Sequence, residues 1–86
     1  MVTVVIKHEW EQRNEAKVFE TVSGIIKMAK ESKLPQGFRL LSAYADSGSR
    51  TAFCIYEAPS KQAFQELVSK INPPTAYKVY EVSKLY

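Results

Sequence analysis

Four short segments rich in β-branched and aromatic residues alternate with two longer segments of helical periodicity, and this alternation constrains the fold more than any other feature. The strand-like segments are residues 2–9, 37–45, 50–58 and 76–86. Short runs of this composition, bounded by turn-forming residues or by helical patterns, are typical of β-strands. The sequence therefore predicts four strands and two helices in one domain that spans residues 1–86.

The first helical segment lies within residues 10–35. Its apolar side chains recur with a period of 3.6 residues, which indicates one buried stripe. Asn14 is the expected N-cap, and Pro35 is expected to stop the helix because the residue before a proline avoids the helical region. Gly24 inside the helix predicts either a close approach of another element or a local weakness. The stripe consists of Val18, Val22, Ile25, Ile26 and Ala29.

The second helical segment follows Ser60, a good N-cap residue, and ends before Pro73 and Pro74. Its apolar stripe is Ala63, Phe64, Leu67, Val68 and Ile71. Between the second and third strands, residues 46–49 read Asp-Ser-Gly-Ser, a run that tolerates turn conformations. These two strands are therefore expected to form a hairpin.

The resulting element order is β-α-β-β-α-β. Each β-α-β unit must cross over with the right hand, which leaves few topologies. Two interlocked units give an α+β ferredoxin-like sandwich, in which an antiparallel sheet of strand order 4-1-3-2 carries both helices on one face. We expect this fold.

Both faces of every predicted strand carry apolar or aromatic side chains. A sheet with helices on one face only would then leave a large apolar patch on the other, which monomers rarely show. A chain of 86 residues also has a small core of its own. We expect a homodimer packed through these sheet faces, and the alternative is a tyrosine-rich face in contact with solvent.

Residues 34–73 contain a set of recognisable motif residues, which are Pro35, Gly37, Arg39, Leu40, Leu41, Asp46, Gly48, Ser49, Phe53 and Glu57. Through these residues the segment resembles a small family of uncharacterised prokaryotic domains within the dimeric α/β-barrel superfamily. The resemblance implies a ferredoxin-like homodimer. The superfamily holds cofactor-free and haem-degrading monooxygenases, lactone isomerases, stress-response dimers and metal-responsive proteins, so the fold does not select a function. Members often carry Trp-His where this chain has Ala43-Tyr44.

His8, the only histidine, ends the first strand and is the main candidate for chemistry. An imidazole titrates near neutral pH and suits proton transfer. We expect His8 to share a face with Val4 and Ile6, beside the starts of the third and fourth strands. In an enzyme, Tyr44 and Tyr56 would be orienting donors. The alternative is a half-buried histidine at the end of the sheet.

A metal site is not expected. His8 and Cys54 lie on adjacent predicted strands, but a slip of one residue would place them on opposite faces. A zinc site needs three or four protein ligands, and no CxxC or HxxxH spacing is present. No phosphate loop, dinucleotide fingerprint or catalytic triad is found either. We therefore expect no metal and no cofactor.

The charge and composition exclude several other classes. The net charge of +3 is dispersed, so no nucleic-acid partner is expected. The single cysteine forms no internal disulfide and fits the cytoplasm. The N-terminal residues do not resemble a signal peptide, and no apolar run is long enough to cross a membrane.

Two functions follow from these observations. The first is a small-molecule-binding or stress-associated module with an apolar cavity between the sheet and the helices. The alternative is a cofactor-independent monooxygenase or isomerase that acts on a small apolar or aromatic substrate through His8. An enzyme requires an open cavity that reaches His8, whereas a purely structural dimer would have that region filled by Trp10 and its neighbours.

Overall fold

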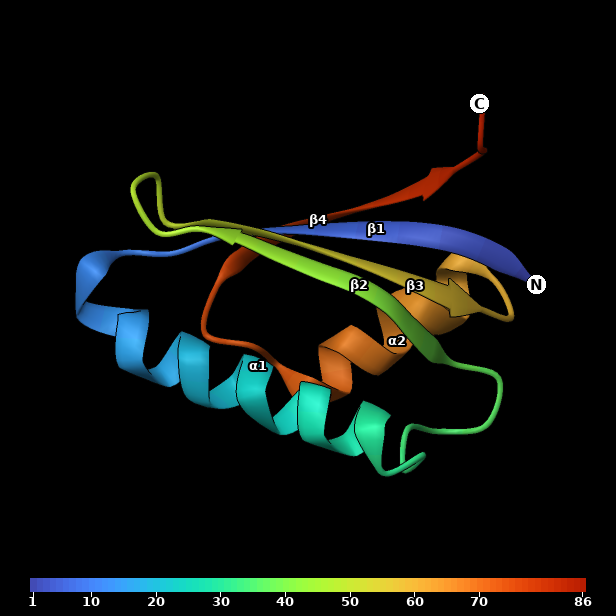
Figure 1. The fold of residues 1–86 in the computed structure, drawn as a ribbon, viewed down its shortest axis with the longest axis horizontal. Coiled ribbons are helices and arrows are strands. Elements are labelled where there is room, and N and C mark those ends of the chain that lie inside the picture. The colour runs from blue at the N-terminus through green and yellow to red at the C-terminus, as the bar shows by residue number, and fades with distance from the viewer.

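The computed structural model describes residues 1–86 and has an α+β architecture. Four antiparallel strands form one sheet, and both helices lie on the same side of it (Figure 1). The elements are β1 (Val2–Glu9), a 3-10 turn η1 (Gln12–Asn14), α1 (Glu15–Lys30), β2 (Arg39–Asp46), β3 (Thr51–Ala58), α2 (Lys61–Ile71) and β4 (Ala76–Val82).

The strands are arranged in the order β2-β3-β1-β4, with β3 and β1 in the centre. Because a strand order has no preferred end, this is the series 4-1-3-2 when it is read from the β4 edge. The central strands pair antiparallel over their whole length, with Ile6 opposite Cys54. On the other side of β1, Ile6 pairs with Val79 of β4.

The predicted strands agree with the structure except at their ends. β1 has the predicted bounds, whereas β4 ends at Val82 and not at residue 86. Val82 pairs with Thr3, close to the start of β1, so the residues beyond it have no strand to pair with. The last four residues therefore leave the sheet, and Leu85 and Tyr86 are fully exposed.

The ends of α1 differ from those that the sequence predicts. Asn14 occupies the N-cap position, but its side chain makes no capping hydrogen bond. The helix ends at Lys30 because Ser32 adopts a left-handed conformation with φ of 56°. The Ser32 amide then donates to the Ala29 carbonyl, and the Lys33 amide donates to the Met28 carbonyl at 2.8 Å, which closes a Schellman motif. Pro35 is therefore not the residue that stops the helix.

The predicted start of α2 is confirmed. The Ser60 hydroxyl accepts a hydrogen bond from the Ala63 amide at 3.0 Å. At the other end, Asn72 has a left-handed conformation and its amide donates to the Val68 carbonyl. The prolines that follow prevent the helix from continuing.

The core is small and divided. Only ten residues of the chain are buried, seven of them in one cluster between the central strands and α2. A second cluster joins Trp10 and Val18 to Ala52 beneath the first turns of α1. The two helices do not pack against each other, since no Cα atoms of α1 and α2 lie within 8 Å. Neither helix is long and apolar enough to cross a membrane.

Candidate functional site

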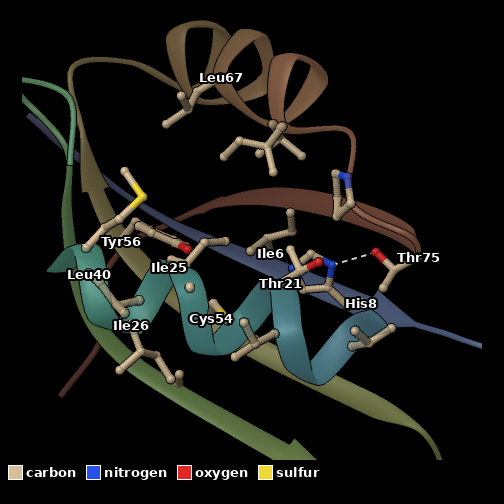
Figure 2. A pocket seen from close by; sticks show the side chains of 18 of the residues that line it. Ile6, His8, Thr21, Ile25, Ile26, Leu40, Cys54, Tyr56, Leu67 and Thr75 are labelled. Atoms are coloured by element: carbon tan, nitrogen blue, oxygen red, sulfur yellow. Dashed lines mark hydrogen bonds between the residues drawn. The ribbon is translucent and has the colours of Figure 1, made fainter. Parts of the chain in front are cut away.

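A cavity of about 780 Å³ lies between the two helices and the sheet. Of the 24 residues that line it, 15 are hydrophobic. Figure 2 shows lining side chains that come from both helices and from the strands of the sheet. The representative wall residues are Ile25 and Ile26 of α1, Leu67 of α2, and Ile6, Leu40 and Cys54 of the sheet.

The cavity exists because α1 stands away from α2 and much of the sheet. Small residues line it at several points, including Gly24 on α1 and Ala43 on β2. A Cβ atom added to Gly24 would meet no heavy atom within 4 Å. Gly24 therefore does not mark a close approach of two elements. The apolar stripe of α1 faces this open space, and Val18 is its only fully buried member.

His8 lies at one end of the cavity, on the sheet face that carries Val4 and Ile6, as predicted. Its pairing partners are Ala52 on β3 and Tyr77 on β4, at the starts of those strands. His8 Nδ1 is 2.7 Å from the Thr75 hydroxyl (Figure 2). The other ring nitrogen, Nε2, makes no hydrogen bond to the protein.

Burial lowers the pKa of His8 below its ordinary value of 6.5 because the charged imidazolium loses solvation. The ring is therefore neutral at pH 7, with one nitrogen as a donor and the other as an acceptor. Paired with the Thr75 hydroxyl on Nδ1, the imidazole presents Nε2 as its remaining hydrogen-bonding atom.

Tyr56 lines the other part of the cavity. It is buried on the same sheet face, and its ring packs against Phe64 of α2 at a centroid distance of 4.9 Å. Burial raises the pKa of the Tyr56 phenol, and the neighbouring Cys54 raises it further. The hydroxyl is therefore protonated over the physiological range. It has no protein hydrogen-bond partner.

The structure does not bring Tyr44 to this site. A register shift in β2 lies between Leu40 and Ser42. Leu40 pairs with Tyr56 on the helix-covered face, but Tyr44 pairs with Phe53 on the opposite face and is largely exposed. The β-bulge thus reverses the side on which the second half of the strand places its side chains.

His8 and Tyr56 line one cavity but lie far apart along the sheet. His8 pairs with Ala52, whereas Tyr56 pairs with Val4. Four residues of strand separate the two positions, which corresponds to about 13 Å. The two side chains therefore enter the cavity from well-separated positions along the sheet.

Cys54 shares the helix-covered face with His8, a point on which the sequence left both registers open. Cys54 pairs with Ile6, so it lies two positions from His8 along the sheet. Burial raises the pKa of the Cys54 thiol, which disfavours the thiolate that binds metals. No group of three or more histidine, cysteine, aspartate or glutamate side chains converges anywhere in the chain.

Trp10 lies outside the cavity lining. Its ring is buried and meets Phe19 edge-on at a centroid distance of 6.1 Å. The region beside His8 is therefore open and not filled by Trp10. Thr75, the hydrogen-bond partner of His8, was not anticipated from the sequence. It follows two prolines in a loop, and no local pattern indicates its distant partner.

The cavity with His8 and Thr75 at one end and Tyr56 at the other is thus the main feature of the molecule that can hold a ligand. Comparison with protein-family models, with curated proteins and with solved structures finds no match for this chain.

Proposed function

We propose that this protein binds a small, largely apolar molecule in the cavity between its helices and its sheet. The observation that carries the proposal is the cavity itself, about 780 Å³ in volume and lined mainly by hydrophobic side chains. Pockets of about 300–1,000 Å³ with apolar walls and a few polar groups are typical ligand sites. A core of only ten buried residues would also gain stability from a ligand that fills this space.

Binding accounts for the site residues better than catalysis does. An isomerase or monooxygenase that used His8 for proton transfer would need orienting donors at the same reacting atom. Tyr44 lies on the other face of the sheet, and Tyr56 is several residues away along it. His8 alone remains for such chemistry, and its bond to Thr75 suits a fixed hydrogen-bonding role.

The binding proposal can be tested with Nile red, an uncharged dye that fluoresces in apolar surroundings. The variant Ala43→Phe places a large ring in the cavity from an exposed position, so the core packing stays intact. We expect saturable one-site binding to the wild-type protein and affinity weakened at least about tenfold in this variant.

Ala45→Phe is the matched control. Ala45 lies two residues further along the same strand and face, is also exposed, and does not line the cavity. This variant should bind the dye like the wild type. Absence of saturable binding to the wild type, or equal weakening by both variants, would contradict the proposal.

We further propose that the domain is a ferredoxin-like homodimer, with a second copy on the sheet face that no helix covers. Aromatic and apolar side chains gather on this outer face, and two ion pairs on the same face join Lys7 to Glu9 and Arg39 to Glu57. Apolar and aromatic side chains together with polar groups are the usual composition of an interface. The apolar residues of this face are Val5, Tyr44, Phe53, Ile55, Tyr80 and Val82.

The size of the outer face supports a second copy as its occupant. Strands at about 4.8 Å spacing and about 3.3 Å per residue give this sheet an area of about 500 Å², so two copies bring about 1,000 Å² together. The C-terminal residues also leave the sheet on this side, away from the helices (Figure 1). Their exposed Leu85 and Tyr86 would extend the contact. The free thiol of Cys54 suits the reducing cytoplasm, where we place this dimer.

Sedimentation velocity tests the dimer. Phe53→Lys replaces an apolar ring of the outer face by a second positive charge beside Lys7 and should give a monomer. Met28→Lys is a control of equal exposure, 40% against 39%, on α1. It should sediment like the wild type. A wild-type protein that remains monomeric at high concentration would refute this part of the proposal.

A further inference from the structure

The polar groups of the cavity lie at its two ends. His8 and Thr75 stand at one end, and the Tyr56 hydroxyl stands toward the other, with the apolar side chain of Ile6 between them (Figure 2). The offset of four strand residues sets them about 13 Å apart at the backbone. Ile6 and Cys54, which pair with each other between these two positions, also line the cavity, so its wall between the two ends is apolar.

Both ends offer unused hydrogen-bonding atoms. His8 uses Nδ1 with Thr75 and leaves Nε2 without a protein partner. The Tyr56 hydroxyl has no protein partner either, and Tyr56 lines the same cavity. Thr21, another hydroxyl of the wall, donates its hydrogen to the Lys17 carbonyl of its own helix and therefore has none left to donate to a ligand.

The cavity carries no net charge. Its only formally charged lining residues are Lys17 and Glu20. They have opposite signs, lie three residues apart on α1 and are both exposed. No cation stands in the interior to pair with an anionic ligand, and burying an unpaired charge among apolar side chains is costly.

From this arrangement we propose that the ligand is an elongated, uncharged molecule with an apolar middle and one hydrogen-bonding group at each end. One end bonds His8 Nε2, and the other bonds the Tyr56 hydroxyl. This inference rests on the proposed binding function and adds the ligand class to it.

Three rigid two-ring compounds separate the features of this ligand class. The first, 4,4'-dihydroxybiphenyl, is uncharged at pH 7 and has a hydroxyl at each end. The second, 2,2'-dihydroxybiphenyl, has the same composition with the hydroxyls close together. The third, 4'-hydroxybiphenyl-4-carboxylate, keeps the length and adds a negative charge. Each is titrated against the protein by displacement of Nile red.

The 4,4' compound should bind at least about fivefold more tightly than either of the others, because only it satisfies both ends without a buried charge. His8→Leu and Tyr56→Phe should each weaken it by about five- to tenfold and leave the 2,2' compound unchanged. Tyr44→Phe removes the same hydroxyl from the outer face and should change nothing. Thermal melting of each variant shows whether it is folded.

The outcomes separate this inference from the proposed function. If Nile red binds in the cavity but the 2,2' compound or the carboxylate binds as tightly as the 4,4' compound, the ligand class is wrong and the binding function stands. Equal affinity of Tyr56→Phe and wild type for the 4,4' compound would also overturn it. If neither Nile red nor any of the three compounds binds, both proposals fail.

Discussion

Replacement of Gly24 by alanine should stabilise the protein, and the gain follows from the open space beside α1. Gly24 lies in the interior of a 16-residue helix. Glycine in a helix interior is less favourable than alanine by about 0.8–1.0 kcal/mol, because it loses more backbone entropy on folding. A new Cβ at this position meets nothing within 4 Å, so no steric cost opposes the gain. The expected change in the free energy of unfolding is therefore about +0.5 to +1 kcal/mol.

Urea denaturation at constant pH measures this change directly. For a domain of this size, 1 kcal/mol corresponds to about 4–8 °C in Tm. Gly37→Ala is the opposing control, because Gly37 has φ of 91° and its Cβ would lie 2.9 Å from Pro59 Cγ. Gly37→Ala should lower the free energy of unfolding by more than about 1 kcal/mol. A loss of stability in Gly24→Ala would mean that α1 packs closely on another element, which would refute the open cavity.

Three further predictions concern capping, packing and protonation. Ser60→Ala should lower the free energy of unfolding, measured by urea denaturation, by about 1 kcal/mol, because α2 loses its capping hydrogen bond. Asn14→Ala removes no such bond and should lower it clearly less. Phe64→Ala should lower the free energy of unfolding by about 3–5 kcal/mol, since the ring is 2% exposed and packs on Tyr56. A loss below about 1 kcal/mol would contradict the tight packing of this ring in the core. Because burial lowers the pKa of His8, the unfolded chain binds its proton more tightly, so stability should fall as the pH drops through 6.5 towards the lower folded pKa. The same titration of His8→Leu should show a smaller fall, and identical curves would show that His8 does not contribute.

The arrangement of elements along the chain was predictable because each element carries its own local signal. β-branched runs mark the strands, and the hydroxyl of Ser60 marks the start of α2. The face on which His8 lies also followed from strand alternation alone. In each case the relevant physics acts over a few neighbouring residues.

The features that were missed depend on contacts between distant parts of the chain. The β-bulge beside Leu41 could not be predicted, because a strand that is apolar on both faces shows no break in its alternation of apolar and polar residues. The bulge places Tyr44 on the face opposite the site. The left-handed Ser32 ended α1 where a glycine would have been the usual marker. The cavity reflects how far α1 stands from α2, a tertiary distance that periodicity does not encode.

The central claim, that the ligand lies between the helices and the sheet, is tested most directly by methyl NMR. A titration with 4,4'-dihydroxybiphenyl should shift the methyl resonances of Ile6, Ile25 and Leu67, which line the cavity. Those of Val5 and Ile55, on the outer face, should stay in place. Shifts confined to the outer-face residues, or no shifts at a saturating concentration, would contradict a ligand site in this cavity.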